Sequence, residues 1–182
     1  EAAAGAPVPV WNGELYFEMH RGTFTSQART KVGNRRCEGL LREAELWWAT
    51  AGQVPAAVMA ELDELWKQVL VQQFHDILPG SSITWVYDDA EAVHTHVAAR
   101  LEALIADALH RLTPAVPTIA NPTAFQRREV VAFAPSAVGN VPGQVLHDGS
   151  VAFLAEVPGL GLAPATPPSS STTAATRADD RV

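Results

Sequence analysis

Apolar residues recur at three- and four-residue spacing along three long segments of this chain. The segments span residues 26–51, 55–76 and 84–112. This spacing gathers the apolar side chains on one face of an α-helix, so each segment is predicted to be helical. Because the connections are short, antiparallel packing is the simplest way to bury the three faces together. The sequence therefore predicts a mainly α protein built on an antiparallel three-helix bundle. Its buried residues should include Leu41, Trp66, Val69, Val97, Leu101 and Leu104.

Residues with known preferences for helix ends mark the limits of these segments. Thr25 or Ser26 can cap the first helix, because a side-chain oxygen there accepts a free N–H group of the first turn. Gly52 is suited to end the same helix. The pair Thr113-Pro114 ends the third helix, since proline cannot continue the hydrogen-bond ladder.

After the helices the pattern changes to short β-like segments separated by proline and glycine. The segments cover residues 118–122, 127–133, 143–149 and 151–158. Asp148-Gly149 stands between two short apolar runs, which is a signal for a β-hairpin. Left alone, such strands would expose edges and apolar faces. We interpret them as the first strands of an incomplete β-sandwich region.

The chain thus divides into four parts. Residues 1–24 are an extended lead with a strand-like run at 15–17, and residues 25–114 are helical. Residues 115–162 are rich in β-like segments. Residues 163–182 are low in complexity and rich in alanine, proline, serine and threonine, so we expect a mobile loop there.

Composition limits the classes of partner. Apolar residues make up 47% of the 182 residues, which is enough for a core, and the net charge of −7 argues against nucleic acid and anionic membranes. No apolar run is long enough to cross a bilayer, and the N-terminus does not resemble a signal peptide. The single cysteine, Cys37, excludes an internal disulfide and a cysteine-based zinc site, and it is expected to be buried in a helix. This usage suits a cytoplasmic protein.

The six histidines do not form a metal site within one helix. None shows the His-x-x-x-His or His-Glu-x-x-His spacing that such a site requires. His94 and His96 diverge by about 200° around their predicted helix, so they cannot share a metal. Both are therefore expected at the surface.

The segment 73–82, Gln-Phe-His-Asp-Ile-Leu-Pro-Gly-Ser-Ser, places an imidazole and a carboxylate side by side before a helix-breaking Pro-Gly pair. At about 100° per residue, His75 points away from the apolar stripe of its predicted helix. Two interpretations remain open. His75 could be a structural histidine bonded at the helix end. Alternatively, His75 and Asp76 could belong to a site that another part of a larger protein completes.

Three stretches carry a longer pattern that includes this segment: residues 14–29, 34–47 and 62–83. In this order, they resemble the segment that leads into the middle domain of glycoside hydrolase family 38, the first helix of that domain and its signature motif. The members of this family are the class II α-mannosidases. The resemblance runs from about residue 8 to 112 and continues loosely to about 162. Phe74 before His75 is similar to the bacterial and cytosolic branch of the family.

The resemblance implies a retaining exo-α-mannosidase that acts on terminal α-mannosyl residues through two carboxyl groups. It also implies a divalent metal, usually zinc, that binds sugar hydroxyls. His75 matches one metal ligand, and Asp76 matches a residue that contacts the sugar. The other three ligands, the nucleophile and the acid/base would lie in an N-terminal catalytic domain upstream of residue 1. The chain would then hold the exit of that domain, the helical middle domain and the start of the C-terminal β domains.

A second class of function stays open at this point. The chain could be a free-standing helical interaction module without catalytic activity, with the outward face around Gln68, Val71 and His75 as its partner surface. An unfinished β part argues against this interpretation. A different metallohydrolase built on His75 and Asp76 would need further ligands that the sequence does not offer.

Overall fold

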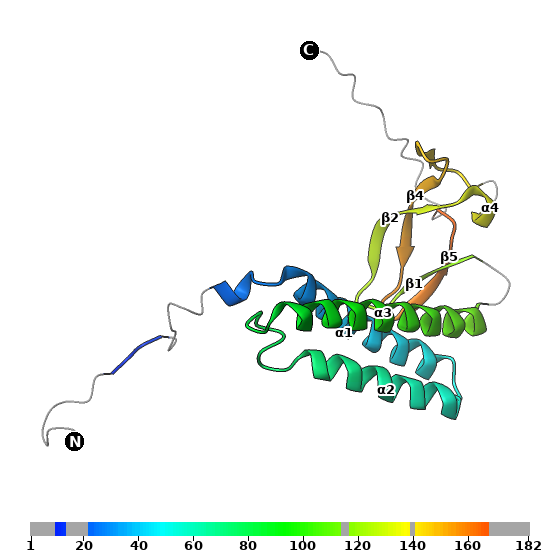
Figure 1. Ribbon diagram of the computed structural model, residues 1–182. Helices are drawn as coiled ribbons and strands as arrows, with labels where there is room; N and C mark the ends of the chain where they lie inside the picture. The colour runs from blue at the N-terminus through cyan, green and yellow to red at the C-terminus, as the bar shows by residue number, and fades with distance from the viewer. Residues whose placement is uncertain (1–9, 14–21, 114–116, 139–140, 168–182) are drawn as a thin grey trace, which may run out of the picture. The chain divides into compact units, whose positions relative to one another are not determined.

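The computed structural model describes residues 10–13, 22–113, 117–138 and 141–167. The strand-like run predicted at 15–17 and most of the predicted mobile loop lie outside these residues. Three long helices come first and short antiparallel strands follow (Figure 1), so the predicted order of elements is confirmed. No helix in the described part of the chain is both long and apolar enough to cross a lipid bilayer.

The three long helices begin and end close to the predicted residues. They are α1 (Ala28–Thr50), α2 (Ala56–Gln72) and α3 (Thr84–Leu112). Gly52 follows α1 with a φ angle of 98°, a left-handed conformation that glycine adopts without steric cost. The prediction was wrong at the end of α2, which stops at Gln72 and not at residue 76.

Contacts divide the chain into two compact units that cut across the helices. Among the described residues, the first unit comprises 10–13, 22–41 and 60–100. Within it, the Cys37 thiol contacts the backbone oxygen of His94 at 3.5 Å, and Arg100 forms an ion pair with Glu61 at 2.7 Å. These contacts join α1 to α3 and α3 to α2. The fully buried Leu41, Val69 and Val97 lie in the core of this unit.

The buried face of α2 differs from the predicted one. Trp66 was expected in the core but is only half-buried, and Leu70 is 54% exposed. The buried residues of this helix are Leu62, Leu65, Val69 and Gln72. They follow a narrow seam at alternating spacings of three and four residues. Trp66 follows the buried Leu65 directly, so it is rotated by about 100° around the helix and lies at the edge of this seam.

Among the described residues, the second unit comprises 42–59, 101–113, 117–138 and 141–167. Trp47 and Leu101 are fully buried in it. The Trp47 indole donates a hydrogen bond to Glu43 Oε1 at 3.1 Å, and the Arg111 guanidinium lies 4.8 Å from the centre of the Trp48 ring. A cation over an indole face is a favourable contact.

The strands of the second unit form two small antiparallel sheets. One sheet pairs β1 (Thr118–Asn121) with β5 (Gly161–Pro164). The other has the order β2-β4-β3, and a short helix, α4 (Pro135–Val138), follows β2. Its strands are β2 (Arg127–Phe133), β3 (Gln144–Val145) and β4 (Val151–Val157).

The structure tests the predicted hairpin at Asp148-Gly149 and the predicted start of the low-complexity loop at residue 163. The predicted hairpin joins β3 to β4, and Gly149 in its turn has a φ angle of 82°. In contrast, the expected low-complexity loop does not begin at residue 163. Residues 163 and 164 are part of β5, and Ala165 is only 3% exposed. A composition typical of loops is thus overridden here by pairing with β1.

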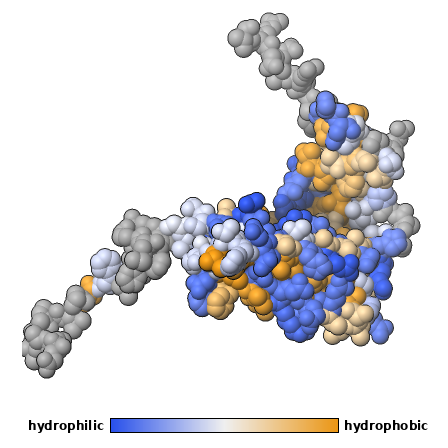
Figure 2. All heavy atoms as spheres, viewed as in Figure 1, coloured by the Kyte–Doolittle hydropathy of each residue, from blue (hydrophilic) through white to orange (hydrophobic). Residues whose placement is uncertain are grey.

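Several apolar side chains of the second unit are exposed, both in its strands and in the turns between them. Hydrophobic residues are visible among these strands in Figure 2. The exposed residues include Phe125, Val130, Val145 and Leu160.

His94 is buried, so the prediction of a surface residue was wrong. Its side chain is 4% exposed, and neither ring nitrogen has a hydrogen-bond partner among the described residues. Gly33 on α1 leaves the room for the ring. A Cβ atom added at Gly33 would lie 2.7 Å from His94 Nδ1 and 2.8 Å from Cγ. The absent side chain of Gly33 therefore lets the imidazole enter the interface.

This close packing predicts the effect of Gly33→Ala. The substitution should lower the free energy of unfolding by about 1–3 kcal/mol, because the added methyl group overpacks the interface. Gly39→Ala in the same helix is the matched control, since nothing lies within 4 Å of a Cβ there. That control should stabilise by about 0.5–1 kcal/mol through helix propensity. Chemical denaturation of both variants measures the difference, and equal effects would contradict the packing argument.

Candidate functional site

His75 and Asp76 lie in a loop after α2 and not on the helix itself. Residues 73–80 form a series of turns. The N–H groups of Gln73 and Phe74 bond the carbonyls of Leu70 and Val71 at 3.1 and 3.2 Å. These i→i+3 bonds tighten the end of the helix and stop its regular ladder. The helical direction inferred for His75 therefore does not apply, although its outward orientation does.

The His75 and Asp76 side chains form an exposed pair. His75 Nε2 lies 3.3 Å from Asp76 Oδ2, and the two side chains are 76% and 55% exposed. The Phe74 ring packs beside the imidazole with 4.1 Å between ring centres. An imidazole this accessible adds little to a core. Its accessible position is compatible with a site that another part of a larger protein completes.

The start of the loop is held by polar side chains of α1. Gln73 Nε2 donates to Asn34 Oδ1 at 3.1 Å and to Glu38 Oε1 at 3.0 Å. Asn34 in turn donates to Glu38 at 3.1 Å, and it is only 6% exposed. This network fixes the residue that lies two positions before His75.

The backbone of Asp76 is held from its other side. Ser82 Oγ and the Tyr87 hydroxyl both donate to the Asp76 carbonyl, at 2.7 and 3.3 Å. The Tyr87 oxygen also accepts the N–H group of Ser82 at 2.6 Å. Ser81 Oγ donates to Asp76 Oδ1 at 3.2 Å and thereby orients the carboxylate. One oxygen of Asp76 therefore faces Ser81 and the other faces His75.

The end of the loop is fixed by Lys31 of α1. Lys31 Nζ donates to the backbone oxygens of Leu78 and Pro79 at 3.0 and 3.3 Å. Sequence reasoning did not single out Lys31, Tyr87 or Asn34. A lysine, a tyrosine and an asparagine within helical patterns resemble ordinary surface or core residues, and their partners are distant in sequence.

The donors present fit one part of a zinc site. Imidazole nitrogen and carboxylate oxygen are both common zinc ligands. However, no group of three or more histidine, cysteine, aspartate or glutamate side chains that could hold a metal occurs within the described ranges. His96, His110 and His147 are exposed. His75 and Asp76 can thus contribute to a metal centre but cannot form one by themselves.

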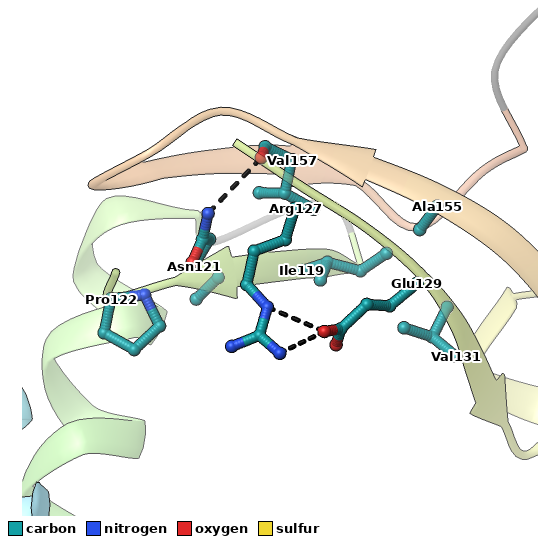
Figure 3. A pocket seen from close by; sticks show the side chains of 9 residues that line it. Ile119, Asn121, Pro122, Arg127, Glu129, Val131, Ala155 and Val157 are labelled. Atoms are coloured by element: carbon teal, nitrogen blue, oxygen red, sulfur yellow. Dashed lines mark hydrogen bonds and ion pairs between the residues drawn. The ribbon is translucent and has the colours of Figure 1, made fainter. Parts of the chain in front are cut away.

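A pocket of about 150 Å³ in the strand-rich unit offers no competing site (Figure 3). Its polar side chains already serve the fold. The Asn121 amide donates to the backbone oxygens of Phe125 at 2.9 Å and Pro158 at 3.0 Å, and Arg127 pairs with Glu129. The Asn121 bonds join the end of β1 to the segments that flank β2 and β4, and the Arg127–Glu129 pair lies within β2, so these groups serve the structure of the unit.

Comparison with known proteins agrees with the resemblance seen in the sequence. The family model described as alpha mannosidase middle domain matches residues 18–112, which is just over half of the chain. Alpha-mannosidase G of Dictyostelium discoideum is 45% identical over 104 residues, covering 57% of this chain and 10% of that protein. Human alpha-mannosidase 2C1 is 35% identical over 168 residues, covering 88% of this chain and 15% of that protein.

The alpha-mannosidase of Saccharomyces cerevisiae is 49% identical over 88 residues, covering 46% of this chain and 8% of that protein. The chain therefore spans a small part of the length of each of these relatives. All three organisms are eukaryotes, so these matches do not confirm the expected bacterial branch. The family match and the shared sequence show that the chain belongs to the alpha-mannosidase middle-domain family.

Proposed function

We propose that this chain is part of a metal-dependent, retaining exo-α-mannosidase that hydrolyses terminal α-mannosyl residues. The observation that carries the proposal is the exposed pair of His75 and Asp76, which lies on a loop held at its start, middle and end within an alpha-mannosidase middle domain. The substrates would be terminal α-mannosides of glycans or oligosaccharides. The protein partners would be the catalytic domain and the β domains of the same enzyme.

In this proposal His75 supplies one nitrogen ligand to a divalent metal, most simply zinc. The ligand must be the neutral imidazole, because a protonated ring has no lone pair to donate. Its exposure leaves room for ligands from elsewhere to approach. When bound, the metal would hold and orient hydroxyl groups of the terminal mannose.

Asp76 is proposed to accept hydrogen bonds from mannose hydroxyls. A carboxylate has about four acceptor positions. Two of its neighbours, Ser81 and His75, occupy only part of this capacity. The contact with Ser81 also fixes the carboxylate plane before a sugar arrives, which reduces the ordering cost of binding.

The remaining parts of the mechanism are assigned outside this chain. The three other metal ligands, the carboxylate nucleophile and the acid/base are proposed to come from the catalytic domain. The resemblance assigns the chain to the bacterial and cytosolic branch, because Phe74 precedes His75 in the sequence. The single cysteine, Cys37, is buried and is compatible with the cytoplasm.

The alternative of a helical interaction module also has an observation in its favour. Val71 and Phe74, which lie near His75 in sequence, are 62% and 54% exposed. An apolar surface of this kind suits a protein partner. The enzyme proposal accounts for the same exposure, because the face that carries a partial site must meet the domain that completes it.

An assay on the full-length protein tests the proposal. We expect hydrolysis of an aryl α-mannoside but not of the matching aryl β-mannoside. Removal of metal by a chelator should abolish turnover, and zinc should restore it. A pure, zinc-loaded full-length protein that hydrolyses no α-mannoside would reject the enzyme proposal in favour of the interaction module.

A further inference from the structure

Lys31 of α1 bonds two backbone carbonyls at the end of the loop and a third in the turn before α1. Its ammonium group makes three hydrogen bonds: to the oxygens of Leu78 at 3.0 Å, Pro79 at 3.3 Å and Ser26 at 2.6 Å. An ammonium group has three N–H donors, so each of them has a carbonyl partner. The side chain is partly buried, and its contacts run to backbone atoms that cannot move without moving the chain.

Gly80 allows this arrangement. A Cβ atom added there would lie 2.7 Å from Ser26 Cβ and 3.2 Å from Ser26 O. Its φ angle of 96° also suits glycine. The end of the loop can therefore approach the turn before α1 closely. This approach brings the carbonyls of residues 78 and 79 within reach of the same ammonium group that binds Ser26.

Lys31 and Asn34 lie three residues apart on α1, so they share one face of the helix. Asn34 belongs to the network that holds Gln73 at the start of the loop, and Lys31 holds its end. His75 and Asp76 lie between these two attachments. Rotation of the loop about α2 would break both sets of bonds at once.

We propose that Lys31 is a positioning residue, which sets the path of the loop so that His75 and Asp76 face the metal and the sugar. This inference rests on the proposed function of those two residues. Residues that hydrogen-bond to metal ligands orient these ligands. Mutation of such a residue commonly weakens metal binding or activity by about 10- to 100-fold. Lys31 would act in this way through the backbone, and not through contact with the ligand side chain.

The test compares three variants of the full-length enzyme. Lys31→Met keeps the apolar stem and removes the three donors. Lys67→Met is the matched control, because Lys67 is an exposed lysine of α2 that pairs with Asp63 and Glu64 and does not touch the loop. His75→Ala reports whether the loop binds the metal at all. Zinc affinity is measured by competition with a chelating dye, and hydrogen exchange is measured on the loop and on α2.

We expect Lys31→Met to weaken zinc binding by roughly 10- to 100-fold. The amides of Ile77, Leu78 and Gly80 should exchange faster, while those of α2 keep their protection. The kcat should fall more than KM changes, because the fraction of enzyme with a correctly placed ligand falls. Lys67→Met should match the wild type in zinc affinity and exchange.

Three outcomes would overturn the inference. If His75→Ala weakens zinc binding and Lys31→Met does not, the positioning role of Lys31 fails by itself. If His75→Ala leaves zinc binding unchanged, the proposed function fails, and the inference fails with it. If Lys31→Met removes protection throughout α1 and α2, Lys31 supports the fold in general and does not position the loop.

Discussion

Replacing His75 by alanine in the full-length enzyme should remove most of the bound zinc and most of the α-mannosidase activity while the helices remain intact. The side chain is 76% exposed, so its loss opens no cavity in a core. It would, however, remove one of four proposed metal ligands. We expect zinc affinity to fall by more than roughly 100-fold, which is the upper range for mutation of a residue that only orients a metal ligand.

Asp76→Asn is the matched comparison for this prediction. The amide keeps the size of the side chain but lacks the charge that favours hydrogen bonds from sugar hydroxyls. Activity should therefore fall more than zinc content does. Metal analysis measures the zinc content of both variants, an activity assay measures their turnover, and circular dichroism measures their helical content. Wild-type zinc content and turnover in His75→Ala would reject the ligand assignment, and loss of helical signal would restore the interpretation of His75 as a structural residue.

Acid should destabilise the helical part of the protein through His94. Burial lowers the pKa of this imidazole, and the nearby Glu91 carboxylate partly opposes the shift. Glu91 is itself paired with Arg29 at 3.1 Å. Because the pKa is lower in the folded protein than the ordinary value of 6.5, the unfolded chain binds the proton more readily. The contribution of neutral His94 is thus complete above pH 6.5 and is lost as the pH falls toward the folded-state pKa.

The loss can reach about 1.4 kcal/mol for each pH unit within that window. Denaturation of wild type and His94→Leu between pH 7.5 and pH 5 measures it. The variant should lose less stability on acidification than the wild type. His96→Leu is the control, since His96 lies two residues farther along α3 and is exposed. An acid dependence that is the same in all three proteins would show that His94 is not responsible.

The periodic parts of the fold could be predicted because their apolar spacing is local information. The limits of α3 and the turn at Gly149 agree with the structure for this reason. The error at His94 has a different origin. Its burial depends on the absent side chain of Gly33, which is 61 positions away (94 − 33), and periodicity cannot report such a pairing.

The candidate site could be predicted in identity but not in geometry. The adjacent imidazole and carboxylate of His75 and Asp76 were visible in the sequence, as was the Pro-Gly pair that follows. The early end of α2 was not visible, because no glycine or proline stands in α2 or between α2 and Pro79, whereas the i→i+3 bonds of Gln73 and Phe74 end the regular ladder at Gln72. The supports of the loop could not be predicted either. Lys31 bonds main-chain carbonyls 47 and 48 positions away, and every residue has a carbonyl. Gln73 bonds side chains of Asn34 and Glu38 that are 39 and 35 positions away.

Bonds to backbone oxygens leave the side chains of the loop open to engineering. Lys31, Ser82 and Tyr87 all reach main-chain oxygens of the loop. The course of the loop is consequently specified separately from the chemical groups that it displays. Side chains beside His75, such as Phe74, could be exchanged in a library aimed at new sugar preferences without rebuilding the scaffold beneath them.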